Sequence, residues 1–128
     1  MTHIVKQFNS IVEDLLQQTT HLIGTKYLFN FNLIIRFNVV LPIEKFTINM
    51  LPYKKYIMAC NTDFFMNNEI DLSGYNSINY NDIIDLKQIF QNINEESKKN
   101  IWNILQALII LCEERLINKS SVSRIQNL

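Results

Sequence analysis

The fold is decided by residues 94–117, which read NEESKKNIWNILQALIILCEERLI. Asn94 is a residue type that caps helices, and the two glutamates after it place negative charge in the first turn, where the helix dipole favours it. Beyond that turn, apolar side chains occupy most of the helical circumference. A helix that is apolar on nearly every side is buried. We therefore expect residues 94–117 to form the central helix and Trp102 to be structural.

The rest of the chain supplies further helical segments. Near the N-terminus, apolar residues recur at spacings of three and four, at Ile4, Phe8, Ile11, Val12, Leu15 and Leu16. Pro42 and Pro52 each stand before a short amphipathic run, and proline suits the first turn of a helix. Another helix is expected to begin at residues 81–82, after a loop at residues 69–80. The pattern predicts a mostly α, compact multi-helix domain.

Residues 27–41 admit two interpretations. Every odd position in this stretch is apolar, which is the period of a β-strand. A strand of this length would be about three times longer than usual, whereas a buried helix of this length is ordinary. We favour the helix. The alternative is an α+β fold with a hairpin in residues 27–51, in which residues 46–50 form the second strand.

Length and composition favour one domain. The chain has 128 residues, of which 48% are hydrophobic and 19% are charged. A chain of this size and composition buries a substantial core, so we assign residues 1–128 to a single domain. From residue 118 onward the sequence is polar, and residues 118–128 are expected to form a flexible tail.

The charge balance argues against nucleic acid and membranes as partners. The 12 basic and 12 acidic residues cancel, so the chain as a whole offers no field that attracts phosphate backbones or anionic lipid. The lysine pairs at residues 54–55 and 98–99 are too weak a signal to change this expectation. No apolar stretch reaches the roughly 20 residues that span a bilayer, and the N-terminus lacks the apolar core of a secretion signal. We expect no nucleic acid partner, no membrane span and an intracellular location, either cytoplasmic or virion-associated.

The residue types that carry chemistry are few and scattered. His3 and His21 both fall outside the apolar stripe of the first helical segment. Cys60 and Cys112 lack the close spacing of zinc or redox motifs. The carboxylates lie mainly on polar helix faces or at helix starts, which does not indicate a catalytic pair. We therefore expect no enzymatic activity, no metal and no cofactor, and we identify no small-molecule substrate.

The middle of the chain holds a surplus of large apolar residues. Tyr53, Tyr56, Phe64 and Phe65 belong to short segments around Asn61 that cannot readily bury all of them. An exposed apolar patch on a monomer usually marks a contact surface. These four are the predicted partner-binding residues, with Phe64 or Phe65 as the anchor; the alternative is that Phe64, Phe65 and Met66 fill the gap between the first and last helices. The partner is expected to be another protein or a second copy of this chain.

Three motifs in residues 56–108 carry a resemblance. They are Tyr56-Ile57, Asn61-x-x-Phe64-Phe65-x-x-Asn68-x-Ile70 and Asn94-x-x-Ser97-Lys98-Lys99-x-Ile101-Trp102-x-x-Leu105-Gln106-x-Leu108. This arrangement resembles small uncharacterised helical proteins of nucleocytoplasmic large DNA viruses. The chain departs from that pattern at Asn103, where a tyrosine or lysine is usual. The resemblance implies a viral origin, which agrees with the richness in asparagine and isoleucine, and it implies no particular activity.

These observations predict a non-enzymatic interaction or structural protein of viral origin that acts through an apolar protein–protein contact surface. The alternative is a small helical viral inhibitor of a host pathway that binds an amphipathic host helix in a groove between its own helices.

Overall fold

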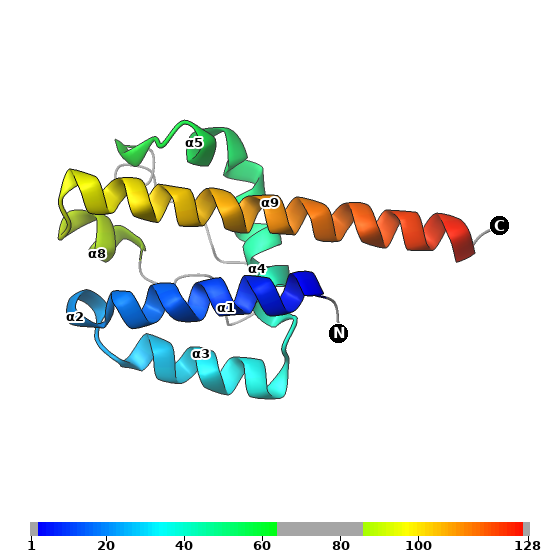
Figure 1. Cartoon of the computed structure of the whole chain (residues 1–128), viewed down its shortest axis with the longest axis horizontal. Coiled ribbons are helices and arrows are strands. Elements are labelled where there is room, and N and C mark those ends of the chain that lie inside the picture. Colours follow the sequence, from blue (N-terminus) through cyan, green and yellow to red (C-terminus); the bar gives the residue numbers. More distant parts are fainter. Residues whose placement is uncertain (1–2, 64–85, 127–128) are drawn as a thin grey trace.

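Helix α9 (Glu95–Gln126) is the axis of the fold (Figure 1). The computed structural model describes residues 3–63 and 86–126. The side chain of Asn94 accepts a hydrogen bond from the backbone N–H of Ser97 at 2.8 Å, so the predicted cap is confirmed. The helix packs against α1 (His3–Gln18), α4 (Leu41–Met50) and α5 (Lys54–Met58). The mostly α fold with a central C-terminal helix is therefore confirmed.

The C-terminal part of α9 extends beyond the other helices (Figure 1). The helix continues to Gln126, past residue 118, where the polar composition predicts a tail. Lysine, arginine and serine are compatible with a helix, so a change to polar composition does not by itself end one. The flexibility of residues 118–128 stays a prediction, and residues 127–128 lie outside the described part of the chain.

Helix α1 lies between α9 and α3 (Lys26–Phe37), and it contacts both (Figure 1). Its buried apolar residues keep the predicted spacing, and they are Val5, Phe8, Val12, Leu15 and Leu16. On the facing side of the core, Trp102 is only 4% exposed and its ring stacks on Phe90 with the centroids 4.9 Å apart. The burial of Trp102 is thus confirmed.

Residues 27–51 form helices and a turn, so the hairpin alternative is wrong. Helix α3 ends at Phe37, after which Asn38 is extended and donates its backbone N–H to the carbonyl of Ile34 at 2.8 Å. Helix α4 then begins, with Pro42 in its first turn as predicted. The side-chain amide of Asn9 on α1 donates to the carbonyl of Val39 at 2.8 Å, which holds the turn between the two helices against α1.

Short elements complete the described ranges. Helix α2 (Thr20–Ile23) ends at Gly24, whose φ of 81° suits a residue without a side chain. The 3₁₀ turn η1 (Leu51–Tyr53) contains Pro52 and leads into α5. Helix α8 (Leu86–Gln91) contacts α2. The predicted loop at residues 69–80 and the predicted helix start at residues 81–82 lie outside the described residues.

Candidate interaction surface

The predicted partner-binding segment is partly packed against α9. Tyr53 and Tyr56 are half-buried, while Phe64 and Phe65 lie outside the described residues. The Nζ of Lys54 lies 2.8 Å from a carboxylate oxygen of Glu113 on α9. The two tyrosines are therefore only partly available to a partner, and the roles of the two phenylalanines stay predictions.

Gln106 strengthens this attachment. Its side-chain amide donates to the backbone carbonyl of Ile57 at 3.2 Å, and it lies 3.4 Å from both the carbonyl of Met58 and the Sγ of Cys60. The last carbonyls of a helix have no partner within the helix, so Gln106 supplies one for α5. Trp102 and Gln106, two residues of the motif at 94–108, thus connect α9 to α8 and α5.

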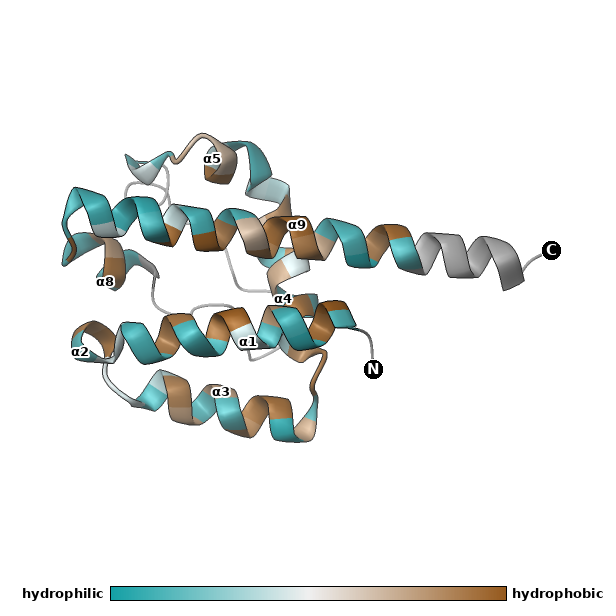
Figure 2. Ribbon diagram, viewed as in Figure 1, coloured by the Kyte–Doolittle hydropathy of each residue, from teal (hydrophilic) through white to brown (hydrophobic). Residues whose placement is uncertain are grey.

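The most exposed aromatic residues of the described chain lie on α3. Phe29 is 64% exposed and Phe37 is 85% exposed, with the half-buried Leu33 midway between them. A spacing of four residues places all three on one side of the helix. Hydrophobic (brown) and hydrophilic (teal) residues alternate along α3 in Figure 2. Helix α3 lies on the side of α1 that faces away from α9 (Figure 1).

The alternating sequence of α3 explains this exposure. Residues two positions apart point to nearly opposite sides of an α-helix, because each residue turns the chain by about 100°. The odd positions therefore separate into two stripes. Tyr27, Phe31 and Ile35 form the inner stripe, in which Phe31 is fully buried, and the second stripe is the exposed one. An odd-position pattern on a helix thus produces two apolar stripes on opposite sides, which distinguishes α3 from both a strand and a fully buried helix.

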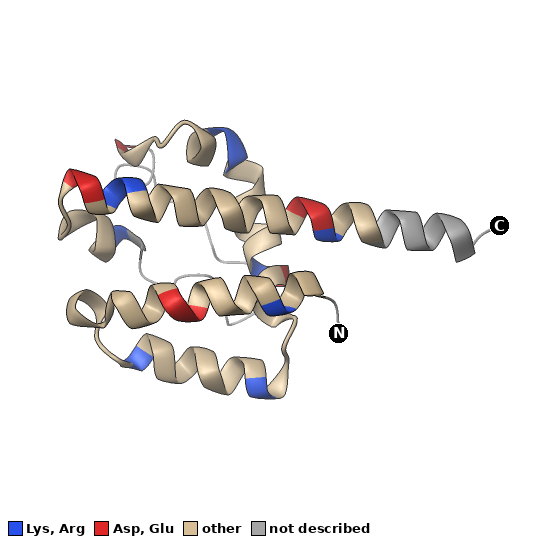
Figure 3. Cartoon of the chain, viewed as in Figure 1, with Lys and Arg blue, Asp and Glu red and all other residues tan. Residues whose placement is uncertain are grey.

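Two cations flank the exposed stripe. Lys26 and Arg36 are exposed at opposite ends of α3, and the helix contains no acidic residue (Figure 3). Within the residues that the structure describes, neither cation forms an ion pair, although the Nζ of Lys26 lies 5.0 Å from the centre of the Tyr27 ring. We call Lys26, Phe29, Leu33, Arg36 and Phe37 the outer face of α3.

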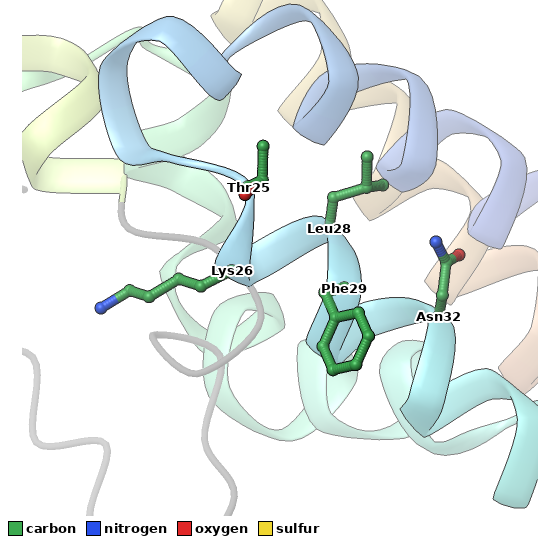
Figure 4. Close-up of a pocket in the computed structure, with 5 residues that line it drawn as sticks. All are labelled: Thr25, Lys26, Leu28, Phe29 and Asn32. Atoms are coloured by element: carbon green, nitrogen blue, oxygen red, sulfur yellow. The ribbon is translucent and has the colours of Figure 1, made fainter.

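A hollow opens beside Phe29 at the start of the outer face. It is a shallow depression, open to solvent, with a volume of about 480 Å³, and it is lined by Thr25, Lys26, Leu28, Phe29 and Asn32. Leu28 points toward α1, whereas the ring of Phe29 and the side chain of Lys26 extend away from α1 (Figure 4). The hollow is mainly apolar with polar groups at its edge, which suits an apolar side chain of a partner.

A second hollow lies between α1 and α9. Its volume is about 250 Å³, and its lining consists of Gln7, Ile11, Ala107, Ile110, Leu111 and Glu114. Ile110 is 47% exposed at this position. Its position between two helices fits the alternative of a groove for a host helix.

The candidate chemical residues remain separate from one another. His3 and His21 are exposed, as predicted. Cys112 is buried on α9, and burial raises the pKa of its thiol from 9.0 to about 11, while Thr47 acts in the opposite direction through a hydrogen bond. A thiol with a raised pKa is a poor nucleophile at neutral pH. Across residues 3–63 and 86–126, no three His, Cys, Asp or Glu side chains come together in a way that could hold a metal ion.

None of the helices in the described ranges combines the length and the apolar character needed to cross a membrane. Comparisons with protein families, with curated proteins and with solved structures find no match to this chain.

Proposed function

We propose that this protein is a non-enzymatic interaction protein that binds another protein through the outer face of α3. The observation that carries the proposal is the presence of two apolar stripes on one helix. The inner stripe is covered by α1 and α4, whereas the outer stripe exposes Phe29 and Phe37. Large exposed aromatic side chains on a rigid helix are typical anchors of protein interfaces.

The side chains around the stripe support an interface. Interfaces combine a small apolar centre with a polar rim, and arginine and aromatic residues are enriched in them. On α3, Phe29, Leu33 and Phe37 supply the centre, and Arg36 and Lys26 supply the rim. The proposal includes a viral origin and an intracellular site of action, in the cytoplasm or the virion, and these rest on the resemblance of residues 56–108.

Site-specific photo-crosslinking tests the proposal. A photoreactive phenylalanine analogue is introduced at Leu33, in the centre of the outer face, and the tagged protein is irradiated in the cells in which it is naturally made. We expect a discrete crosslinked protein band from position 33. The matched control carries the same analogue at Ser10, an exposed position of α1 outside the outer face. No band from position 33, or the same bands from both positions, would contradict the proposal.

A second candidate function is a small inhibitor that takes an amphipathic host helix in a groove. The hollow between α1 and α9 favours this function, because its apolar lining accepts a side chain of such a helix. Here Ile110→Glu is the informative substitution. Ser10 lies beside Gln7 and Ile11 of this hollow, so a crosslinked band from position 10 that is lost in Ile110→Glu and retained in Phe37→Ser would support the inhibitor over the first proposal.

A further inference from the structure

The chemistry of the outer face specifies the kind of partner it fits. We infer that the outer face of α3 binds an amphipathic helix whose apolar stripe is flanked by acidic residues. The inference rests on the proposed function, since it names the partner class for the same surface.

The positive charge of the outer face is not neutralised within the described chain. Three other cations pair with acids, in the pairs Lys54–Glu113, Lys98–Glu95 and Arg115–Glu44. Lys26 and Arg36 have no such partner among the residues that the structure describes. They are ten positions apart, which corresponds to about 15 Å along the helix. A partner with acids at a similar separation would meet both cations.

The position of Lys26 at the start of α3 is electrostatically unfavourable for a cation. The lysine is the first residue of α3, where the helix dipole favours an acid, and Thr25 provides no side-chain cap. Apart from its contact with the Tyr27 ring at 5.0 Å, the lysine therefore contributes little to the stability of α3, and its charge is available to an acidic partner.

The apolar stripe has the dimensions of a helix contact. Phe29 and Phe37 are eight positions apart, or about 12 Å, which is roughly two helical turns. A partner helix with apolar side chains at spacings of three and four covers such a stripe, and one of them fits the hollow of about 480 Å³ beside Phe29.

The edges of the stripe favour a protein over a lipid surface. Asn30 and Asn32 are exposed on its two sides. Carboxamides form hydrogen bonds readily with backbone and side-chain groups of a protein, and burying them in hydrocarbon without a partner is unfavourable. A hollow is likewise better matched to a single side chain than to disordered acyl chains.

A displayed library of helical peptides tests the inference directly. The peptides are 20 residues long, with the stripe positions varied among Ala, Leu, Ile and Phe, and the flanking positions varied among Glu, Lys and Gln. Selection against the full-length protein should enrich glutamate over lysine at the flanks by about threefold or more, the effect expected of two exposed ion pairs.

Three matched variants make the result specific. The double variant Lys26→Glu/Arg36→Glu should invert the charge preference, and Phe29→Ser/Phe37→Ser should lose the selected peptides. Ile48→Ser, which changes a 64% exposed residue of α4, should retain them. Circular dichroism of each variant verifies that the fold is intact. Enrichment without a charge preference, or a preference that the α3 variants leave unchanged, overturns the inference.

Two further experiments ask whether a membrane or a second copy of the chain covers the outer face of α3 instead. Co-sedimentation with vesicles of 70% phosphatidylcholine and 30% phosphatidylserine that is lost in Phe29→Ser/Phe37→Ser would assign the face to a membrane and overturn the inference. Sedimentation equilibrium showing a dimer that the same variant dissociates would assign it to a second copy and also overturn it. If crosslinking from position 33 finds a protein while the library shows no acidic preference, the proposed function stands and the acidic partner is wrong.

Discussion

Trp102 joins two elements that are separate in the sequence, because its ring on α9 stacks on Phe90 of α8. Trp102→Ala removes that contact and leaves a cavity in the core. We expect the free energy of unfolding to fall by about 3 to 5 kcal/mol. Urea denaturation followed by circular dichroism measures it. The adjacent exposed residue supplies the control, since Asn103→Ala should change stability by less than about 0.5 kcal/mol. A midpoint that hardly moves in Trp102→Ala would show that the ring contributes little to the core.

Cys112 makes stability depend on pH in the alkaline range. Its pKa rises from 9.0 to about 11 in the folded protein because burial disfavours the thiolate. The resulting stability is complete below pH 9 and is lost as the pH rises toward 11, because the unfolded chain releases the proton first. The loss should reach about 2 to 3 kcal/mol. Comparison with Cys112→Ala at each pH isolates this contribution from the tyrosines and lysines. Equal pH dependence of the two proteins would contradict the prediction.

At the scale of the helix, two serine substitutions in α3 distinguish its buried inner stripe from its exposed outer face. Phe31→Ser places a hydroxyl at a fully buried position, so we expect a loss of about 3 kcal/mol or more, or no folding. Phe37→Ser changes the same residue type at an 85% exposed position, and stability should stay within about 0.5 kcal/mol. Thermal unfolding of the two variants gives the comparison. Similar losses in both would mean that Phe37 belongs to the core.

The sequence predicted those helices whose apolar residues keep one period. In α1, spacings of three and four identify the buried side directly, and in α9 the apolar residues occupy most of the circumference after Asn94, which marks its start. In α3 the apolar period is two, which is ambiguous in a sequence and becomes informative only when the backbone is known to be helical. The outer face therefore appeared only in the structure. The hollow beside Phe29, which is lined only by residues between positions 25 and 32, depends on side-chain conformations that the sequence pattern does not specify.

Two of the four predicted partner-binding residues also depend on contacts that a local sequence pattern does not reveal. Tyr53 and Tyr56 were selected because their short segment has too many apolar residues to bury alone. Helix α9 provides Glu113 and Gln106 for this segment, across about 50 to 60 positions of sequence. Contacts of that separation leave no local pattern. The predicted patch lies in residues 53–66, whereas the most exposed aromatic side chains of the described chain are Phe29 and Phe37 on α3.

For the molecule as a whole, the distribution of charge determines how it meets nucleic acid. The chain has 12 basic and 12 acidic residues. Lys26 and Arg36 of α3 form no ion pair with the residues that the structure describes, and two phosphate contacts release few counterions. The exposed Phe29 and Phe37 could stack on bases, which makes single-stranded RNA the more demanding test. We expect no complex tighter than about 100 μM with duplex DNA or single-stranded RNA at 50 mM salt, the weak end of non-specific binding.

Fluorescence anisotropy with labelled 20-mers measures the affinity, and Lys26→Glu/Arg36→Glu is the matched control. A micromolar complex that weakens steeply with salt and is lost in the control variant would show that the outer face of α3 binds nucleic acid, because only electrostatic contacts to phosphates give that combination.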